Sequence, residues 1–137
     1  EICACLVGSE MCIRDSYGAK LFLPGTRSIG IGVCDDPFAE IAFDLMNGVK
    51  SLLDSDVPVR REDICIHYHI GPGYAVPSQA GTAAVRRLAQ AEGILADPVY
   101  TGKALAGLFE LLEQGELEDA EDILFVHTGG AGALFAL

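Results

Sequence analysis

Four hydroxyl-bearing side chains of this 137-residue chain lie on loop-like segments flanked by glycine. They are Tyr74, Tyr100, Thr101 and Thr128. Their hydroxyl groups can donate or accept hydrogen bonds without carrying charge at neutral pH. Such groups suit the orientation of a heteroaromatic cofactor. Each one alone is typical of a loop or of a helix cap, so only the whole set indicates a binding site.

A glycine pair, Gly129 and Gly130, follows Thr128 directly. Backbone N–H groups in such a turn can cradle a phosphate, and the absence of Cβ atoms equally allows a flat ligand to pack closely. The lysine of a P-loop is missing from this run. The plain structural alternative is a tight turn between a strand and a helix.

Two other polar groups have simpler structural interpretations. Cys65, His67 and His69 would share one face of a strand, but a metal site there needs a fourth ligand from elsewhere. Asp35 and Asp36 could act as paired carboxylates, although adjacent acidic residues at a helix start more often cap the helix. The sequence therefore favours ordinary sheet positions and a helix cap, and no metal site.

Hydrophobic periodicity predicts the elements that position these residues. Alternating apolar residues indicate strands at 29–33 and 64–70, and the continuous apolar run at 123–126 is typical of a strand buried on both faces of a parallel sheet. Apolar repeats at three and four residues indicate three helices. Their expected caps are Asp35 or Asp36, then Ser78, then Thr101, and the last two helices are expected to end at Gly93 and Gly115.

Strands that alternate with helices predict an α/β fold, a parallel sheet with flanking helices. Ligands of such sheets bind at the C-terminal ends of the strands. Three loops that leave strands read CDDP, GPGY and HTGG, and a fourth, DPVYTGK, leads into a helix. The chemistry is therefore expected in these four loops, whereas residues 17–27 are expected to form a simple loop or turn.

The composition narrows the class of partner. A net charge of −11 argues against nucleic acid and anionic membrane surfaces, both of which select lysine and arginine. No apolar run reaches the roughly 18–20 residues that a membrane span needs. We therefore expect a small-molecule partner, no nucleic acid and no membrane.

The first sixteen residues stand apart from the rest. Three of the five cysteines, Cys3, Cys5 and Cys12, lie there. A back-translation of the segment LVGSEMCIRD resembles the mosaic end of a transposon-based sequencing adapter. We therefore hypothesise that residues 1–16 are translated adapter, and that residues 17–137 are the native part of a chain truncated upstream. The two remaining cysteines would suit a reduced, intracellular enzyme.

Three segments together resemble one family. GPGYAVP, AEGILADPVYTGKALAGL and ILFVHTGGAGALFA are similar to the C-terminal part of pyridoxal-phosphate enzymes with the tryptophan-synthase-β-like fold (fold type II). The nearest branch is that of D-cysteine desulfhydrase and 1-aminocyclopropane-1-carboxylate deaminase. The resemblance covers nearly all of residues 17–137, and DPVYTGKA together with HTGG is its most specific part.

Two positions separate the activities within that branch. The deaminases typically carry Glu after the tyrosine of DPVY and Leu before the glycine pair, where this chain has Thr101 and Thr128. A carboxylate beside the pyridine nitrogen strengthens the electron sink that opens a cyclopropane, whereas a neutral threonine suffices for β-elimination. The resemblance thus implies a lyase that converts D-cysteine to pyruvate, hydrogen sulfide and ammonia. The alternatives are the deaminase or a related amino-acid dehydratase, and a non-enzymatic α/β binding module.

The resemblance also implies roles for the predicted site residues, with pyridoxal 5′-phosphate as cofactor. Tyr100 would lie over the cofactor and assist acid–base steps, and Tyr74 would line the substrate side. Thr101 and Thr128 would form hydrogen bonds near the pyridine nitrogen. The glycine pair at 129–130 would let the backbone approach the ring.

The family's Schiff-base lysine lies in an upstream asparagine–lysine motif, which this chain lacks. Lys20, Lys50 and Lys103 do not match that motif, and Lys103 is expected to be structural. We therefore expect the chain by itself to be catalytically incomplete. The resemblance implies a homodimer for the full-length protein, in the cytoplasm or the mitochondrion.

Overall fold

The computed structural model describes residues 2–7, 10–127, 129–130, 132 and 134, with side chains described from Asp15 onward. Its centre is a four-stranded sheet in the order β3-β2-β1-β4, in which all neighbouring strands are parallel. The strands are β1 (Ile2–Val7), β2 (Arg27–Gly32), β3 (Cys65–Tyr68) and β4 (Ile123–Val126). The predicted α/β fold with a parallel sheet is confirmed.

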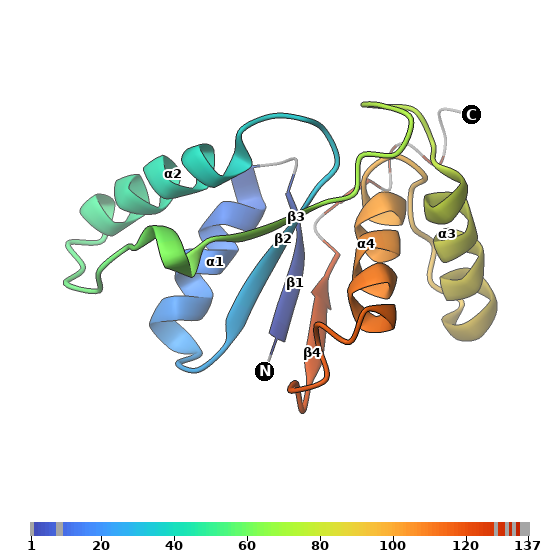
Figure 1. Ribbon diagram of the computed structural model, residues 1–137. Helices are drawn as coiled ribbons and strands as arrows, with labels where there is room; N and C mark the ends of the chain where they lie inside the picture. Colours follow the sequence, from blue (N-terminus) through green and yellow to red (C-terminus); the bar gives the residue numbers. More distant parts are fainter. Residues whose placement is uncertain (1, 8–9, 128, 131, 133, 135–137) are drawn as a thin grey trace.

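Helices cover both faces of the sheet (Figure 1). They are α1 (Glu10–Phe22), α2 (Phe38–Leu52), α3 (Gln79–Glu92) and α4 (Thr101–Glu113), with a short 3-10 helix, η1 (Arg61–Asp63). α1 and α2 lie on one side of the sheet, and α4 lies on the other side with α3 packed against it. Within the described residues, no helix is long and apolar enough to cross a bilayer.

The main core lies between β2 and α4. Ile29 and Ile31 of β2 pack with Leu105 and Leu108 of α4, and all four side chains are buried. Gly107 allows this close approach, because a Cβ atom at that position would lie 2.8 Å from Cγ2 of Ile31. The first turns of α4 are buried on every side, which fixes the start of this helix against the C-terminal ends of the strands.

Three of the expected helix ends, at Ser78, Gly93 and Gly115, are confirmed, and the cap expected at Asp35 or Asp36 is wrong. Gly115 follows Gln114, the C-cap of α4, and has a φ of 76°. Ser78 caps α3 by accepting a 2.9 Å hydrogen bond from the Gly81 N–H, and Gly93 ends that helix in the left-handed conformation. Neither Asp35 nor Asp36 caps α2, which starts after Pro37 without a side-chain cap. The Asp36 carboxylate instead accepts a hydrogen bond from the thiol of Cys34 at 3.2 Å.

Two further expectations are corrected by the structure. Residues 17–22 are not a loop, since they complete α1 and only the turn at Pro24 and Gly25 follows it. β4 is not buried on both faces, since Ile123 and Leu124 are exposed. It is also the last strand of the described sheet. In the described residues β4 pairs only with β1, so the backbone groups along its other edge are not paired with a strand.

The strand between β2 and β4 is β1, which falls within residues 1–16. Parallel pairing is made through backbone groups, and the apolar segment ICACLV has a composition that a sheet interior accepts. The adapter origin of residues 1–16 stays a prediction.

Candidate functional site

Two tyrosines from distant loops meet at the carboxyl end of the sheet. The hydroxyl oxygens of Tyr74 and Tyr100 lie 2.6 Å apart, and the two rings are packed edge to face with centroids 6.1 Å apart. Tyr74 is 58% exposed, and Tyr100 is half-buried. The hydrogen bond with Tyr74, followed by partial burial, raises the pKa of Tyr100. Tyr100 therefore remains a protonated donor at neutral pH, in a pair that faces solvent.

Each tyrosine lies close in the chain to the end of a helix or strand. Tyr74 lies in the loop between β3 and α3, where Gly71, Gly73 and Ala75 all have positive φ angles. Tyr100 directly precedes α4. Since parallel strands end at the same edge of a sheet, a loop after β3 and a helix start beside it come together there. The structure thus brings together the two residues that were predicted to be catalytic.

Asp97 organises the start of α4. It is fully buried, and Oδ1 accepts the N–H groups of Val99 and Tyr100 at 2.9 and 2.7 Å. Oδ2 accepts the N–H of Thr101 at 2.8 Å and its hydroxyl at 2.5 Å. Burial by itself raises the pKa of Asp97, but these hydrogen bonds, led by that of the Thr101 hydroxyl, outweigh it and hold the pKa below the ordinary value. Asp97 is therefore an ionised buried carboxylate that fixes the backbone of Tyr100.

The predicted cap at Thr101 is wrong, because Thr101 is the first residue of α4 and Asp97 bonds its N–H. The Thr101 side chain has no exposed surface, and its hydroxyl both donates to Oδ2 of Asp97 and accepts the Asp97 N–H at 2.8 Å. Its observed contacts are thus with Asp97, and its contact with a cofactor stays a prediction. Thr128 lies outside the described residues.

The glycine pair lies beside this carboxylate. Gly130 has a φ of 93°, and a Cβ atom on it would stand 2.0 Å from Oδ2 of Asp97. Only glycine fits at that position without a shift, so the turn after β4 is packed directly against Asp97. Gly129 is exposed, and a Cβ atom there would meet nothing within 4 Å. One side of the pair is therefore closed by Asp97, and the other offers open backbone at Gly129.

Lys103 is the second buried charge at this edge. It lies in the first turn of α4 with no exposed surface, and its ammonium donates to the carbonyl oxygen of Gly73 at 2.6 Å. Desolvation lowers its pKa. Sequence reasoning gave Lys103 a structural role without a partner and gave Asp97 no role. The Asp-Pro pair at 97–98 was a usable signal for Asp97, because Asp-Pro favours turns in which the aspartate accepts nearby N–H groups.

The histidines of β3 and its end interact with a glutamate. His69 Nδ1 and His67 Nε2 lie 2.9 and 3.4 Å from the same oxygen of Glu110, Oε2. These contacts, that of His69 first, lower the pKa of Glu110. Cys65 is exposed at the start of β3. Among the described residues, no group of three histidine, cysteine or acidic side chains is placed to hold a metal ion.

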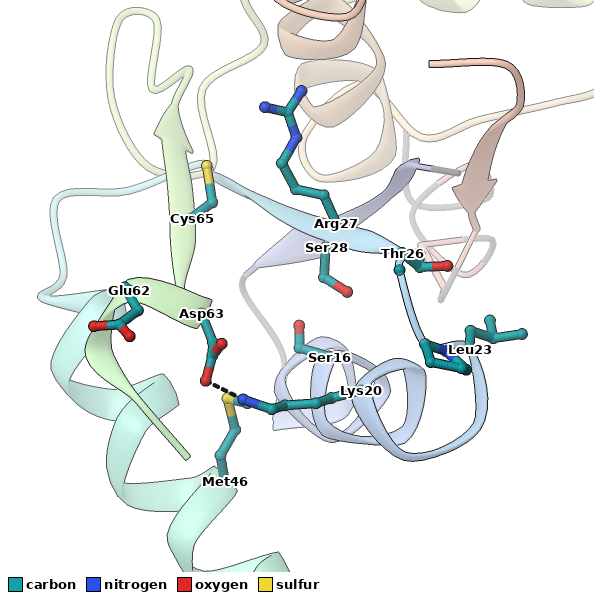
Figure 2. Close-up of a pocket in the computed structure, with 12 residues that line it drawn as sticks. Ser16, Lys20, Leu23, Thr26, Arg27, Ser28, Met46, Glu62, Asp63 and Cys65 are labelled. Carbon is teal, nitrogen blue, oxygen red and sulfur yellow. Dashed lines mark hydrogen bonds and ion pairs between the residues drawn. The ribbon is translucent and has the colours of Figure 1, made fainter. Parts of the chain in front are cut away.

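A cavity of about 350 Å³ opens at the opposite, amino end of the strands (Figure 2). Lys20 of α1 reaches across it to form an ion pair with Asp63, and Ser28 and Cys65 line it from the starts of β2 and β3. Its charged side chains are partly exposed. None of the predicted site residues lines it, so it is separate from the tyrosine pair.

The chain belongs to the family of pyridoxal-phosphate dependent enzymes, since the model of that family matches residues 25–129. It is 42% identical over 123 residues to the D-cysteine desulfhydrase of Klebsiella pneumoniae subsp. pneumoniae, a match that covers 88% of this chain and 37% of the relative. It is 40% identical over 124 residues to the D-cysteine desulfhydrase of Yersinia pestis (strain Pestoides F), with the same coverage.

A crystal structure of an ACC deaminase homologue has a similar fold, with a TM-score of 0.81 and 30% sequence identity over 98% of this chain and 41% of that chain. The chain therefore spans well under half the length of the relatives that it matches. The family membership confirms the resemblance inferred from the three sequence segments.

The described residues fit part of a site for the family's cofactor. The open backbone at Gly129, whose neighbour Gly130 packs on Asp97, suits a flat ring, and the tyrosine hydroxyls suit a substrate attached to it. Lys20 and Lys103 are engaged by other groups, and Lys50 lies on the side of the sheet opposite α4 (Figure 1). The Lys20 ammonium is paired with Asp63, that of Lys103 is buried on Gly73, and Lys50 lies in the last turn of α2.

Proposed function

We propose that this chain is part of a pyridoxal-phosphate dependent lyase that converts D-cysteine and water to pyruvate, hydrogen sulfide and ammonia. The hydroxyl pair of Tyr74 and Tyr100, at the ligand-binding edge of a chain from this family, is the observation that supports it best. The two D-cysteine desulfhydrases at 40–42% identity support the substrate class.

In the proposed reaction, the tyrosine pair donates a hydrogen bond or a proton to the sulfur atom of the substrate. When bound, pyridoxal phosphate supplies an electron-withdrawing ring that stabilises negative charge at the substrate Cα. Sulfide leaves from Cβ as a thiolate and needs a hydrogen-bond donor. Tyr100, whose pKa is raised, is protonated at neutral pH and can donate to that sulfur, while Tyr74 orients its hydroxyl.

Other residues of the chain would hold the ring. We propose that the backbone of Gly129 and Gly130 packs against the cofactor and that Thr128 lies near its pyridine nitrogen. Thr101 would act beside that nitrogen through the network that already joins it to Asp97. The absence of a carboxylate at position 101 favours β-elimination over the opening of a cyclopropane ring.

The test is an assay of the full-length enzyme with D-cysteine. We expect sulfide and pyruvate in equal amounts, and a fall in kcat of about 100-fold or more for Tyr100→Phe, since general acid catalysis typically contributes that much. Tyr17→Phe is the matched control, because the Tyr17 hydroxyl is bonded to the Val57 carbonyl on the far face of the sheet. An unchanged kcat in Tyr100→Phe would contradict the assigned role.

The similarity to an ACC deaminase homologue supports one second candidate, a deaminase of 1-aminocyclopropane-1-carboxylate. Its products are ammonia and 2-oxobutanoate, so the same enzyme offered both substrates separates the two functions. Release of 2-oxobutanoate without release of sulfide would favour the deaminase. The binding-module alternative has no support from the family match.

We also propose that residues 1–16 are adapter-encoded, that the native chain continues upstream of Tyr17, and that the Schiff-base lysine and the phosphate loop lie there. Sequencing the upstream coding region tests all three points, since it should reveal an asparagine–lysine motif. The discovery of codons for residues 1–16 in genomic DNA would refute the adapter origin. We propose as well that the full-length protein is an intracellular homodimer, as the resemblance implies.

A further inference from the structure

Lys103 is a buried charged residue that has no role in the proposed reaction. Its side chain has no exposed surface, and within the described part of the chain its one hydrogen-bond acceptor is the carbonyl oxygen of Gly73, at 2.6 Å. Removing an ammonium group from water is costly unless its new contacts compensate. A leucine or methionine would fill the same space without that cost, so the hydrogen bond to the loop needs an explanation.

The loop that accepts this bond is held firmly at its two ends. On the β3 side, the His69 N–H donates to the Gly32 carbonyl at 2.8 Å, and on the α3 side Ser78 is buried and caps the helix. The middle of the loop is different. Tyr74 and its neighbours are largely exposed, and Ala75 has a φ of 58°, a conformation that costs a non-glycine residue about 1–2 kcal/mol. Such a backbone persists only where its surroundings hold it.

Two side chains from the start of α4 contact the middle of this loop. Lys103 bonds the Gly73 carbonyl, and Tyr100 bonds the hydroxyl of the next residue, Tyr74, at 2.6 Å. Residues three apart in a helix lie on the same side of it. Tyr100 already belongs to the helical backbone of α4, because its carbonyl accepts the Ala104 N–H at 2.9 Å. The side chains of Tyr100 and Lys103 therefore point to the same side. One contact fixes the backbone before Tyr74, and the other meets its phenol.

We propose that Lys103 is a positioning residue, which holds the Gly73 carbonyl so that the hydroxyl of Tyr74 stays bonded to that of Tyr100. Without the ammonium, the exposed middle of the loop loses the anchor that a buried side chain provides, and the phenol of Tyr74 moves away from its partner. The consequence for catalysis rests on the proposed function. The positioning itself does not, because the two hydroxyl groups report it directly.

The test reads the Tyr100 phenol by NMR in the full-length protein, labelled with ¹³Cζ-tyrosine and titrated with base. Tyr74→Phe removes the main cause of the raised pKa of Tyr100 and should move that pKa toward the ordinary value. Lys103→Met should move it in the same direction, and adding Lys103→Met to Tyr74→Phe should cause no further change. Lys50→Met, which removes a lysine from the last turn of α2, is the matched control and should leave the titration unchanged.

A merely structural role predicts a different pattern, in which Lys103→Met lowers the melting temperature but leaves the Tyr100 pKa where Tyr74 holds it. That result overturns the proposal. A Tyr100 pKa that is the same in Tyr74→Phe, in Lys103→Met and in the wild type overturns it as well. If Lys103→Met does not fold, Lys103→Gln takes its place, because its shorter neutral side chain also removes the ammonium group. A Tyr100 pKa that moves toward that of Tyr74→Phe supports the proposal, and an unmoved pKa refutes it.

Activity is the separate readout. With D-cysteine as substrate, Lys103→Met should lower kcat/KM by up to about 100-fold, the scale set by a misplacement of about 1 Å. If the enzyme releases no sulfide from D-cysteine while the Tyr100 titrations follow the expected pattern, the proposed function fails and the positioning role stands.

Discussion

The two ends of the parallel sheet handle charge in opposite ways. At the carboxyl end, Asp97 and Lys103 have no exposed surface, and each is bonded to backbone of a loop or helix start. At the amino end, the Lys20–Asp63 pair and Arg27 line a cavity, and their side chains are about a quarter to a half exposed. The first arrangement depends on specific geometry, whereas the second is partly open to solvent.

This difference shows which end is built for chemistry. A buried charge is strongly destabilising when its partner is removed, so it holds its neighbours in one arrangement. An exposed ion pair contributes about 0–1 kcal/mol and permits movement. The tyrosine pair lies at the end where two buried charges fix the backbone around it. The contrast also predicts that equivalent substitutions at the two ends will have unequal effects.

The largest expected effect is that of Asp97→Ala. This change leaves the N–H groups of Val99, Tyr100 and Thr101 without their acceptor. The Thr101 hydroxyl loses its 2.5 Å bond and keeps, as acceptor, only the Asp97 main-chain carbonyl, at 3.3 Å. We expect a loss of about 3–5 kcal/mol in the free energy of unfolding, since each unsatisfied buried group costs about 1–3 kcal/mol. Urea unfolding of the full-length protein measures it.

Asp63→Ala at the amino end is the control for that change, with an expected loss of about 1 kcal/mol or less. The Asp63 carboxylate also accepts a hydrogen bond and an ion pair, but its side chain is 26% exposed. Equal losses for the two variants would remove the distinction between the ends.

Two glycines allow the comparison at matched backbone strain. Gly130 at the carboxyl end has a φ of 93°, and Gly25 at the amino end has a φ of 92°. Alanine at either position pays the same left-handed penalty of about 1–2 kcal/mol. Only at Gly130 does the new Cβ atom collide, 2.0 Å from Oδ2 of Asp97, whereas at Gly25 it meets nothing within 4 Å.

We therefore expect Gly130→Ala to lose about 1–3 kcal/mol more than Gly25→Ala, the usual cost of overpacking. Thermal unfolding of both variants checks the difference. If the two glycines tolerate alanine equally well, the turn after β4 is not packed on Asp97 in solution.

Acid should lower the free energy of unfolding by protonating Asp97. The pKa of Asp97 is lower in the folded protein than in the unfolded chain, where it is about 3.9. Its ionisation therefore contributes stability that is fully present above that unfolded value and is lost as the pH falls through the folded value. The advantage of the wild type over Asp97→Asn should be constant near neutral pH and shrink below about pH 4. A difference that grows in acid has the wrong sign for this account.

The sequence alone predicted the features that depend on local pattern. The cap at Ser78 and the end of α3 at Gly93 follow from residues within one turn of the helix terminus. The meeting of Tyr74 and Tyr100 could be anticipated as well, because loops after parallel strands share one edge. The family membership came from motifs in those same loops.

The remaining features depend on contacts between distant segments. The burial of Lys103 contradicts the usual exposure of lysine, and its partner lies 30 residues away in the chain. Threonine is a common helix cap, which makes Thr101 the expected one, but the Asp97 carboxylate, four residues earlier in the chain, accepts the Thr101 N–H instead. β4 reads as a buried strand by composition, but its place at the edge of the sheet is set by the order of the strands.

The smallest expected effect tests the amino end directly. Lys20→Met breaks the ion pair with Asp63 but keeps most of the apolar stem of the side chain. Because both partners are about a quarter exposed, we expect a loss of at most about 1 kcal/mol, which salt near 1 M should largely abolish since the Debye length is then about 3 Å. Unfolding of Lys20→Met and Lys103→Met at low and high salt makes the comparison. Any change in stability caused by Lys103→Met should be insensitive to salt, because its hydrogen bond is shielded from ions, and a change that salt removes at both positions would mean that Lys103 is not buried.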